Sequence, residues 1–150
     1  MINRLIVISS AILLAGCEVT VDDKAEVEWL QSAGSEDLDR PFSSAVRVDN
    51  LLFLSGQIGF DSESGALVDG GIQAETRQTL ENISQTLEEF GSSMDRVVKC
   101  TVFLADMSEW ATMNEVYVTY FPNKPARSAL GSNGLALNAR TEIECIAVVN

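Results

Sequence analysis

The feature that most constrains this chain is an amphipathic segment, residues 72–90, with strand-like runs on both sides of it. Apolar residues recur in it at helical spacing, and Gly91 follows it as a natural helix stop. A helix with one apolar face needs a surface to cover, and the flanking runs supply a sheet. The stripe of the predicted helix consists of Ile72, Leu80, Ile83, Leu87 and Phe90, with Thr76 in its gap.

The segments before this helix predict short strands. Residues 44–48 and 51–60 are extended runs separated by Asp49-Asn50, a two-residue turn suited to positive φ, and they predict a β-hairpin. A further short segment is expected at 27–30. A short extended piece at 66–68 lies within a loop of turn-forming residues.

The segments after the helix alternate strand, helix and strand. Residues 97–105 are strand-like, and a second helix begins near Asp106 or Ser108 and ends before two prolines. A short strand near 127–130 and a strand over 141–149 follow, separated by a Gly/Ser/Asn loop. The apolar stripe predicted for the second helix consists of Trp110, Met113, Tyr117 and Tyr120.

This order of elements predicts an α+β sandwich with both helices on one face of the sheet. In the last strand Ile143 and Cys145 fall on one face, beneath the helices, whereas Ile146 and Val148 make the other face apolar toward its end. The run 51–54 is likewise apolar on both faces. Since the helices cover one face only, we expect the other to meet another subunit in a homo-oligomer.

The first residues predict a lipoprotein signal. Arg4 supplies a positive start, and the apolar run after it is too short to span a bilayer. Leu14-Ala15-Gly16-Cys17 resembles the bacterial lipoprotein cleavage box, although a buried N-terminal helix with a chance cysteine is the alternative. We expect an exported protein that is held at the membrane on its extracytoplasmic side by the lipid alone. The expected division is a signal over 1–16, an acidic tether over 17–40 with the lipid on Cys17, and the domain over 41–150.

Charge and histidine content limit the chemistry. The net charge is −12 and becomes −13 once Arg4, the one charged residue of the signal, is removed. Such a chain repels phosphate backbones, which disfavours nucleic acid as a partner and ribonuclease as an activity. The sequence contains no histidine, which removes Ser-His-Asp and Cys-His catalysis and any Cys/His metal site. We expect neither a metal nor a cofactor.

Cys100 and Cys145 both lie in apolar strand-like runs. Two thiols could pair in an oxidising compartment, but neither their spacing nor their context demands a disulfide. We interpret them as small residues of the core.

One arginine, Arg127, and a glutamate fifteen residues later, Glu142, flank the Gly/Ser/Asn loop. Each has a structural interpretation, Arg127 in a salt bridge with Glu142 or Glu144, and Glu142 as a solvated strand residue. Each also has a functional one, because a guanidinium can clamp a carboxylate in bidentate fashion and a carboxylate can orient a water molecule. Spacing alone does not separate these interpretations.

The motifs SGQI, ETRQTLEN, NEVY, PARSAL and EIECIAV occur in this order within residues 41–150, and with them the chain resembles the RidA/YjgF family of reactive intermediate deaminases. The resemblance implies a chorismate-mutase-like α+β fold, a mixed sheet with two helices on one face, and a homotrimer with three clefts between subunits. It also implies hydrolysis of small carboxylate-bearing enamines and imines, such as 2-aminoacrylate, to 2-keto acids and ammonia. A protonated imine is already an electrophile, so such a site needs no metal or strong nucleophile.

The resemblance also implies roles for individual residues. Arg127 matches the arginine that holds the substrate carboxylate, and Glu142 matches the glutamate that positions the attacking water. Gly56 and Ala129 match positions that offer backbone groups to the ligand, and Asn114 matches a position near the cleft.

Two positions depart from the family pattern. Phe42, a substrate-contact position, stands where many members have tyrosine, and Ala129 stands where the archetypal deaminases have cysteine, so hydroxyl and thiol roles are lost. The alternative function is a non-catalytic binding or sensing protein for small carboxylates in the cell envelope, using the same cleft. Glu142→Gln should lower turnover only if the chain is an enzyme. A scaffold or chaperone-like protein would be indifferent to Arg127→Ala.

Overall fold

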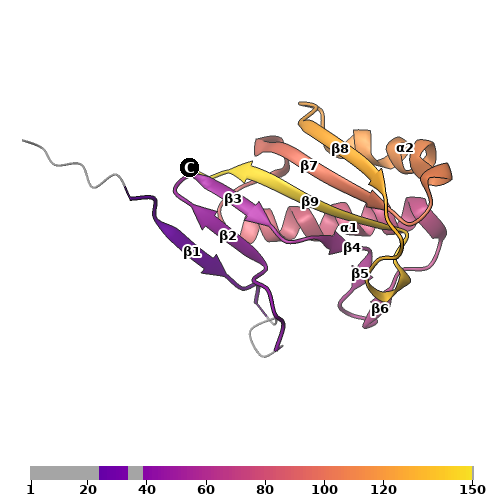
Figure 1. Ribbon diagram of the computed structural model, residues 1–150, viewed down its shortest axis with the longest axis horizontal. Coiled ribbons are helices and arrows are strands. Elements are labelled where there is room, and N and C mark those ends of the chain that lie inside the picture. The colour runs from indigo at the N-terminus through magenta and orange to yellow at the C-terminus, as the bar shows by residue number, and fades with distance from the viewer. Residues whose placement is uncertain (1–23, 34–38, 150) are drawn as a thin grey trace, which may run out of the picture.

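The computed structural model describes residues 24–33 and 39–149. A mixed sheet carries both helices on one face, which confirms the predicted α+β fold (Figure 1). Within these residues no helix combines the length and the apolar character needed to cross a membrane. The predicted signal, Cys17 and part of the tether lie outside the described residues.

The main sheet pairs its strands in the order β1–β2–β3–β9–β7–β8, with β4 also beside β9. Neighbours are antiparallel except for β7 and β8, which run parallel. A separate small hairpin pairs β5 with β6. The bounds are β1 Val27–Leu30, β2 Ala45–Val48, β3 Leu51–Leu54, β4 Gln57–Ile58, β5 Phe60–Asp61, β6 Ala66–Leu67, β7 Val97–Leu104, β8 Ala126–Gly131 and β9 Thr141–Val148.

Two α-helices and three short 3-10 turns connect these strands. The first helix ends where Gly91 takes a φ of 81°, and the Ser92 N–H donates to the Leu87 carbonyl at 2.7 Å. This bond satisfies a carbonyl that the helix itself leaves free. Asp106 caps the start of the turn before the second helix by accepting from the Ser108 N–H at 2.8 Å. The bounds are α1 Gly71–Glu89, η1 Met94–Arg96, η2 Met107–Glu109, α2 Trp110–Tyr120 and η3 Ala136–Asn138.

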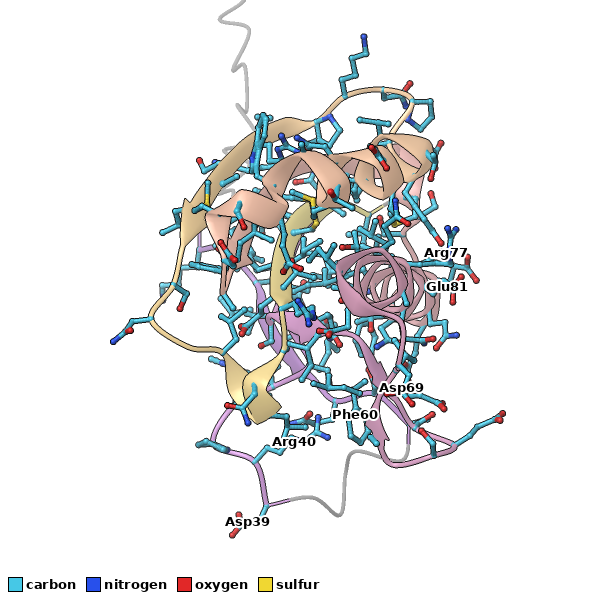
Figure 2. The ribbon with its side chains drawn as sticks, turned by 90° about the vertical axis from the view of Figure 1, so that its right-hand side faces the viewer. Asp39, Arg40, Phe60, Asp69, Arg77 and Glu81 are labelled. Carbon is cyan, nitrogen blue, oxygen red and sulfur yellow. A yellow bond between two sulfur atoms is a disulfide. The ribbon has the colours of Figure 1, made fainter. Side chains whose placement is uncertain are left out.

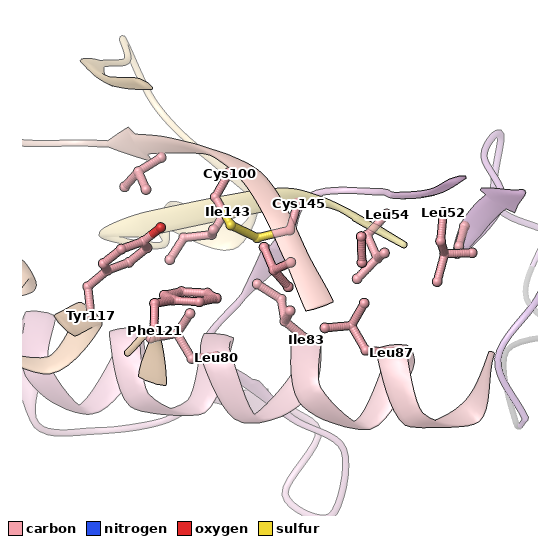
Figure 3. Close-up of a cluster of buried hydrophobic side chains, with 14 of the residues drawn as sticks. Leu52, Leu54, Leu80, Ile83, Leu87, Cys100, Tyr117, Phe121, Ile143 and Cys145 are labelled. Atoms are coloured by element: carbon pink, nitrogen blue, oxygen red, sulfur yellow. A yellow bond between two sulfur atoms is a disulfide. The ribbon is translucent and has the colours of Figure 1, made fainter. Parts of the chain in front are cut away.

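The core lies between α1 and the helix-covered face of the sheet (Figure 3). Leu80, Ile83 and Leu87 of the predicted stripe are fully buried, and Thr76 satisfies its buried hydroxyl by donating to the Ile72 carbonyl at 2.6 Å. From the sheet, the alternate residues of β9 face them as predicted: Ile143, Cys145 and Ala147.

Two sequence predictions need correction. Trp110 was expected in the buried stripe of the second helix, but it stands at the first position of α2 and is 41% exposed, whereas Met113 and Tyr117 are buried. The run 51–60 was expected as one strand, but it is divided into β3, β4 and β5. Gly59 lies so close to the α1 backbone at Glu75 that a Cβ could not fit there, and the chain must bend around the helix.

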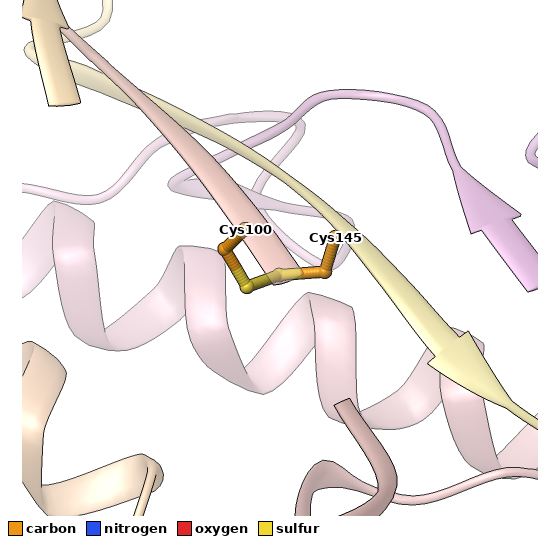
Figure 4. The surroundings of a disulfide bond; sticks show 2 residues. All are labelled: Cys100 and Cys145. Carbon is orange, nitrogen blue, oxygen red and sulfur yellow. A yellow bond between two sulfur atoms is a disulfide. The ribbon is translucent and has the colours of Figure 1, made fainter. Parts of the chain in front are cut away.

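Cys100 and Cys145 form a disulfide, which corrects their interpretation as unpaired core residues (Figure 4). They are direct partners in the antiparallel pairing of β7 with β9, and their Cα atoms lie 4.1 Å apart. Both are buried beneath the helices. The pairing depends on the register of two strands far apart in sequence, which the local spacing of the cysteines does not reveal.

The sheet face opposite the helices keeps apolar side chains in contact with solvent. Trp29 is 71% exposed and Phe53 is 38% exposed. Both pair in register with Val46. Because the neighbours of Val46, Ala45 and Arg47, face the helices, Val46 and its two partners face away from them. Ile146 and Val148 are half-buried on the same face. The uncovered apolar face expected from the sequence is therefore present.

Removing the disulfide should lower the free energy of unfolding without changing the fold, because the cross-link closes a long loop of the unfolded chain. The Cys100→Ala/Cys145→Ala double variant should lose about 2–4 kcal/mol. Urea denaturation of the unmodified chain with and without reductant, beside the double variant, measures this loss. Equal midpoints for all three samples would show that the cross-link does not contribute to stability.

Candidate functional site

Arg127 lies on β8, on the sheet face that the helices cover. It pairs in parallel register with Cys100, whose side chain points into the core. Its Nη1 donates to the Asn114 Oδ1 at 2.6 Å, and its guanidinium carbon lies 4.6 Å from the centre of the Tyr117 ring and 5.8 Å from that of Trp110. All three contacts come from α2, so one helix orients the guanidinium with an amide oxygen and two aromatic rings.

No carboxylate pairs with Arg127 among the residues that the structure describes, since every salt bridge found there involves Arg47 or Arg140. The structural salt bridge considered from the sequence, to Glu142 or Glu144, is therefore not formed within the chain. The guanidinium borders a hollow of about 570 Å³ whose wall includes Asn114, Tyr117, Phe121 and Lys124. It is available to an external anion.

The sequence predicts Trp110 and Tyr117, the two aromatic neighbours of Arg127, only as members of the apolar stripe of the second helix. Trp110, Asn114 and Tyr117 follow one another at helical spacing along one face of α2, so this spacing was the signal available in the sequence. Burial raises the pKa of the Tyr117 hydroxyl, and the nearby Arg127 partly offsets that effect. The hydroxyl has no hydrogen-bond partner within the described part of the chain, so the ring contributes to the site through its face.

Glu142 lies on β9 and faces away from the helices. Its neighbour Ile143 is fully buried under them, and successive strand residues point to opposite faces. Burial, and then repulsion from Glu144, raise the pKa of the Glu142 carboxyl above its usual value. A carboxylate that holds its proton more tightly is a better base near neutral pH.

A second hollow, of about 400 Å³, contains Glu142, Gly56 and Phe42. Gly56 lies against the Glu142 side chain, and a Cβ at position 56 would overlap the carboxylate. Glycine is thus required there for Glu142 to keep its position. The hollow therefore joins a carboxylate, a stretch of exposed backbone and an aromatic ring.

The start of β9 is anchored by a residue that the sequence analysis did not assign. The Glu75 carboxylate is buried in α1, accepts from the Arg140 N–H at 2.7 Å, and lies 3.7 Å from the Arg140 Nε. Arg140 precedes Glu142 by two residues, so this contact fixes the strand where it delivers the carboxylate. ETRQTLEN contains Glu75, but the local sequence does not reveal which backbone N–H it binds.

The structure groups the predicted site residues into two sets. Arg127 and Asn114 share one hollow, while Glu142, Gly56 and Phe42 share the other. Arg127 and Glu142 are on opposite faces and are separated by β7, which is two strand spacings, or about 10 Å. Within one chain they cannot hold the same small molecule.

Ala129 belongs to neither set of wall residues. It follows Arg127 by two positions on the same face of β8, because it pairs in register with the buried Val102. It is half-buried and packs against the core.

The chain is similar in sequence and structure to known proteins. The family model described as Endoribonuclease L-PSP matches residues 36–149. The 2-iminobutanoate/2-iminopropanoate deaminase of Mus musculus is 47% identical over 109 residues, covering 72% of this chain and 81% of that protein. The Homo sapiens protein of the same name is 45% identical over 109 residues, covering 72% and 80%. The crystal structure of RidA from the Antarctic bacterium Psychrobacter superposes with a TM-score of 0.74 at 36% identity, covering 81% of this chain and 99% of that one.

Glu142→Gln should raise the free energy of unfolding at neutral pH. The pKa of Glu142 is higher in the folded chain than in the unfolded chain. Its contribution to the free energy of unfolding is therefore fully present below the pKa of the unfolded state, and it is lost as the pH rises through the pKa of the folded state. Glutamine carries no charge to desolvate, so the gain should disappear in acid. Urea denaturation of both proteins at neutral and acid pH measures it. A variant less stable than the unmodified chain at neutral pH would contradict the assigned environment.

Proposed function

Because the chain belongs to the Endoribonuclease L-PSP family, which includes the RidA/YjgF proteins, we propose that it is a deaminase. Its substrates are small carboxylate-bearing enamines and imines of the 2-aminoacrylate type, and its products are 2-keto acids and ammonia. The mammalian relatives named above support this reaction class, and the residues at the two hollows support the substrate class.

The observation that carries the proposal is the environment of Arg127. In a chain with a net charge of −12, a partly buried arginine is oriented by an amide and two aromatic rings and has no carboxylate partner among the described residues. Arg96 also has no carboxylate partner among the described residues, but its Nε donates to the Val148 carbonyl at 2.9 Å, whereas Arg127 borders an open hollow. A bidentate contact with a substrate carboxylate would give the Arg127 guanidinium the anionic partner that it does not have among the described residues.

We propose further that the complete site lies between two copies of the chain in a homotrimer. One copy contributes Arg127 with Asn114, and the next contributes Glu142 with Gly56. The opposite orientation of Arg127 and Glu142 within one chain supports this arrangement, as does the uncovered apolar sheet face.

The reaction then needs only positioning and proton transfer. Arg127 holds the carboxylate of the protonated imine while Glu142 accepts a proton from a water molecule whose oxygen bonds to the imine carbon. The same carboxyl returns the proton to the nitrogen. The C–N bond breaks as the new hydroxyl becomes the ketone, and its proton leaves with the ammonia as ammonium.

The family description names an endoribonuclease, and RNA is a poor candidate substrate for this chain. The net charge of −12 repels a phosphate backbone, and the sequence contains no histidine for general acid–base cleavage. Lipid attachment at Cys17 and export remain predictions, which membrane fractionation of a Cys17→Ser variant would test. An oxidising compartment would also maintain the Cys100–Cys145 disulfide.

Turnover of enzymatically generated 2-iminobutanoate tests the proposal. Arg127→Ala should abolish both turnover and binding of a 2-keto acid, because the carboxylate loses its partner. Glu142→Gln should retain binding and lower turnover by about 100-fold or more, because the water loses its base. Glu63→Gln is the matched control, because Glu63 is an exposed carboxylate that lines neither hollow.

The result separates the proposed enzyme from a carboxylate-binding protein. Binding that depends on Arg127, without faster imine loss in the unmodified chain, would indicate a protein that binds and does not turn over. Imine loss that survives in Arg127→Ala would place the chemistry elsewhere in the molecule.

A further inference from the structure

The hollow that contains Glu142 has a volume of about 400 Å³ in one copy of the chain, before the neighbouring copy of the proposed site borders it. Hollows of about 300–1,000 Å³ accommodate drug-sized ligands. Apart from Glu142, much of its wall is apolar, from Phe42, Ile58, Phe60 and Leu137. The hollow thus offers space and apolar surface beyond what a methyl side chain fills.

Three polar side chains of this wall, those of Asn82, Ser55 and Ser44, are bonded within the protein itself. The Asn82 Nδ2 donates to the backbone carbonyls of Ile58 and Phe60 at 3.0 and 2.9 Å, which uses both of its hydrogens. The Ser55 hydroxyl donates to a backbone carbonyl at 2.7 Å, and the Ser44 hydroxyl bonds to neighbours on the β1 side. These three groups are not free to recognise a polar substrate side chain, which leaves Gln57 and Arg40 as the other polar side chains of the wall beside Glu142.

Leu137 is the most unusual member of the wall. Its backbone is left-handed, with φ 55° and ψ 19°, and the next residue, Asn138, has φ 61°. For a residue other than glycine or asparagine this conformation costs roughly 1–2 kcal/mol. Within one copy of the chain Leu137 gains little burial in return, since it is 64% exposed there. A strained backbone that holds an exposed aliphatic side chain beside a candidate base indicates a function for that side chain.

Phe42, which is distant from Leu137 in sequence, belongs to the wall of the same hollow. It is 51% exposed, so an apolar group entering the hollow would bury both side chains. Arg40 lies at the exposed end of the same wall, near Phe60 (Figure 2). Arg40 is the cation of this wall that could pair with an acidic side chain of a substrate.

From this wall we propose that Phe42 and Leu137 form a side-chain subsite for branched aliphatic and aromatic imino acids. The inference rests on the proposed deaminase function and deepens it by naming the substrate class. The carboxylate lies at Arg127 of the neighbouring copy, the imine carbon lies at Glu142, and the apolar side chain extends between Phe42 and Leu137.

The test compares imines produced in the assay by an amino-acid oxidase from alanine, leucine, phenylalanine and glutamate. For the unmodified chain, kcat/KM should be about tenfold higher for the leucine and phenylalanine imines than for the alanine imine. Leu137→Gly removes the side chain and relieves the backbone strain, so it should fold normally and reduce this preference about tenfold. Asn138→Gly is the matched control, because it relaxes the same loop at a position outside the hollow, and it should keep the preference.

The outcomes are distinct. If no imine is consumed faster than in buffer, the proposed function fails and the subsite fails with it. If the alanine imine is consumed but is preferred, or if Leu137→Gly leaves the preference intact, the subsite is wrong and the deaminase stands. Preference for the glutamate imine that Arg40→Ala removes would overturn the apolar subsite in favour of a second carboxylate contact.

A second variant distinguishes a role of Leu137 in subunit contact from its proposed role in substrate recognition. Sedimentation of Leu137→Gly shows whether assembly is kept. If assembly is lost, Phe42→Ala measured in an assembled protein decides the question. A lowered preference for the large imines supports the subsite, and an unchanged preference overturns it.

Discussion

The antiparallel pairing of β7 with β9 is the interaction on which the rest of the structure depends. Its register sets Cys100 opposite Cys145 on the helix-covered face and Phe103 opposite Glu142 on the other. β8 continues from β7 in parallel register and thereby places Arg127 on the covered face. A slip of one residue would exchange every face, and the disulfide cross-links the two strands in this register.

This register divides the candidate chemistry between two half-sites. α2 orients Arg127 against one side of the sheet, while Gly56 makes room for Glu142 on the other. Each hollow alone lacks half of what imine hydrolysis needs. The face that leaves Glu142 accessible also carries the exposed apolar residues on which the proposed assembly rests, so the proposed interface and the candidate chemistry depend on the same strand order.

Much of the fold could be predicted because its signals are local. The periodicity of residues 72–90, the positive φ at Asp49 and the alternation of the last strand are all properties of short segments. The disulfide and the division of residues 51–60 were not predictable, because both depend on contacts between distant segments. The site residues followed from motifs, but their separation onto two faces followed only from the register of β7 with its neighbours. The strained loop at Leu137 likewise has no local signal.

The central claim, that Arg127 of one copy acts with Glu142 of another, is tested most directly by mixing two inactive variants. Arg127→Ala and Glu142→Gln chains are unfolded together, refolded together, and assayed for imine hydrolysis beside each variant refolded alone. If the site lies between copies, random mixing should restore intact sites to about a quarter of the total, each with Arg127 from one variant and Glu142 from the other. If the mixture is no more active than the separate variants while the unmodified chain recovers its activity after the same treatment, the two residues do not act across an interface.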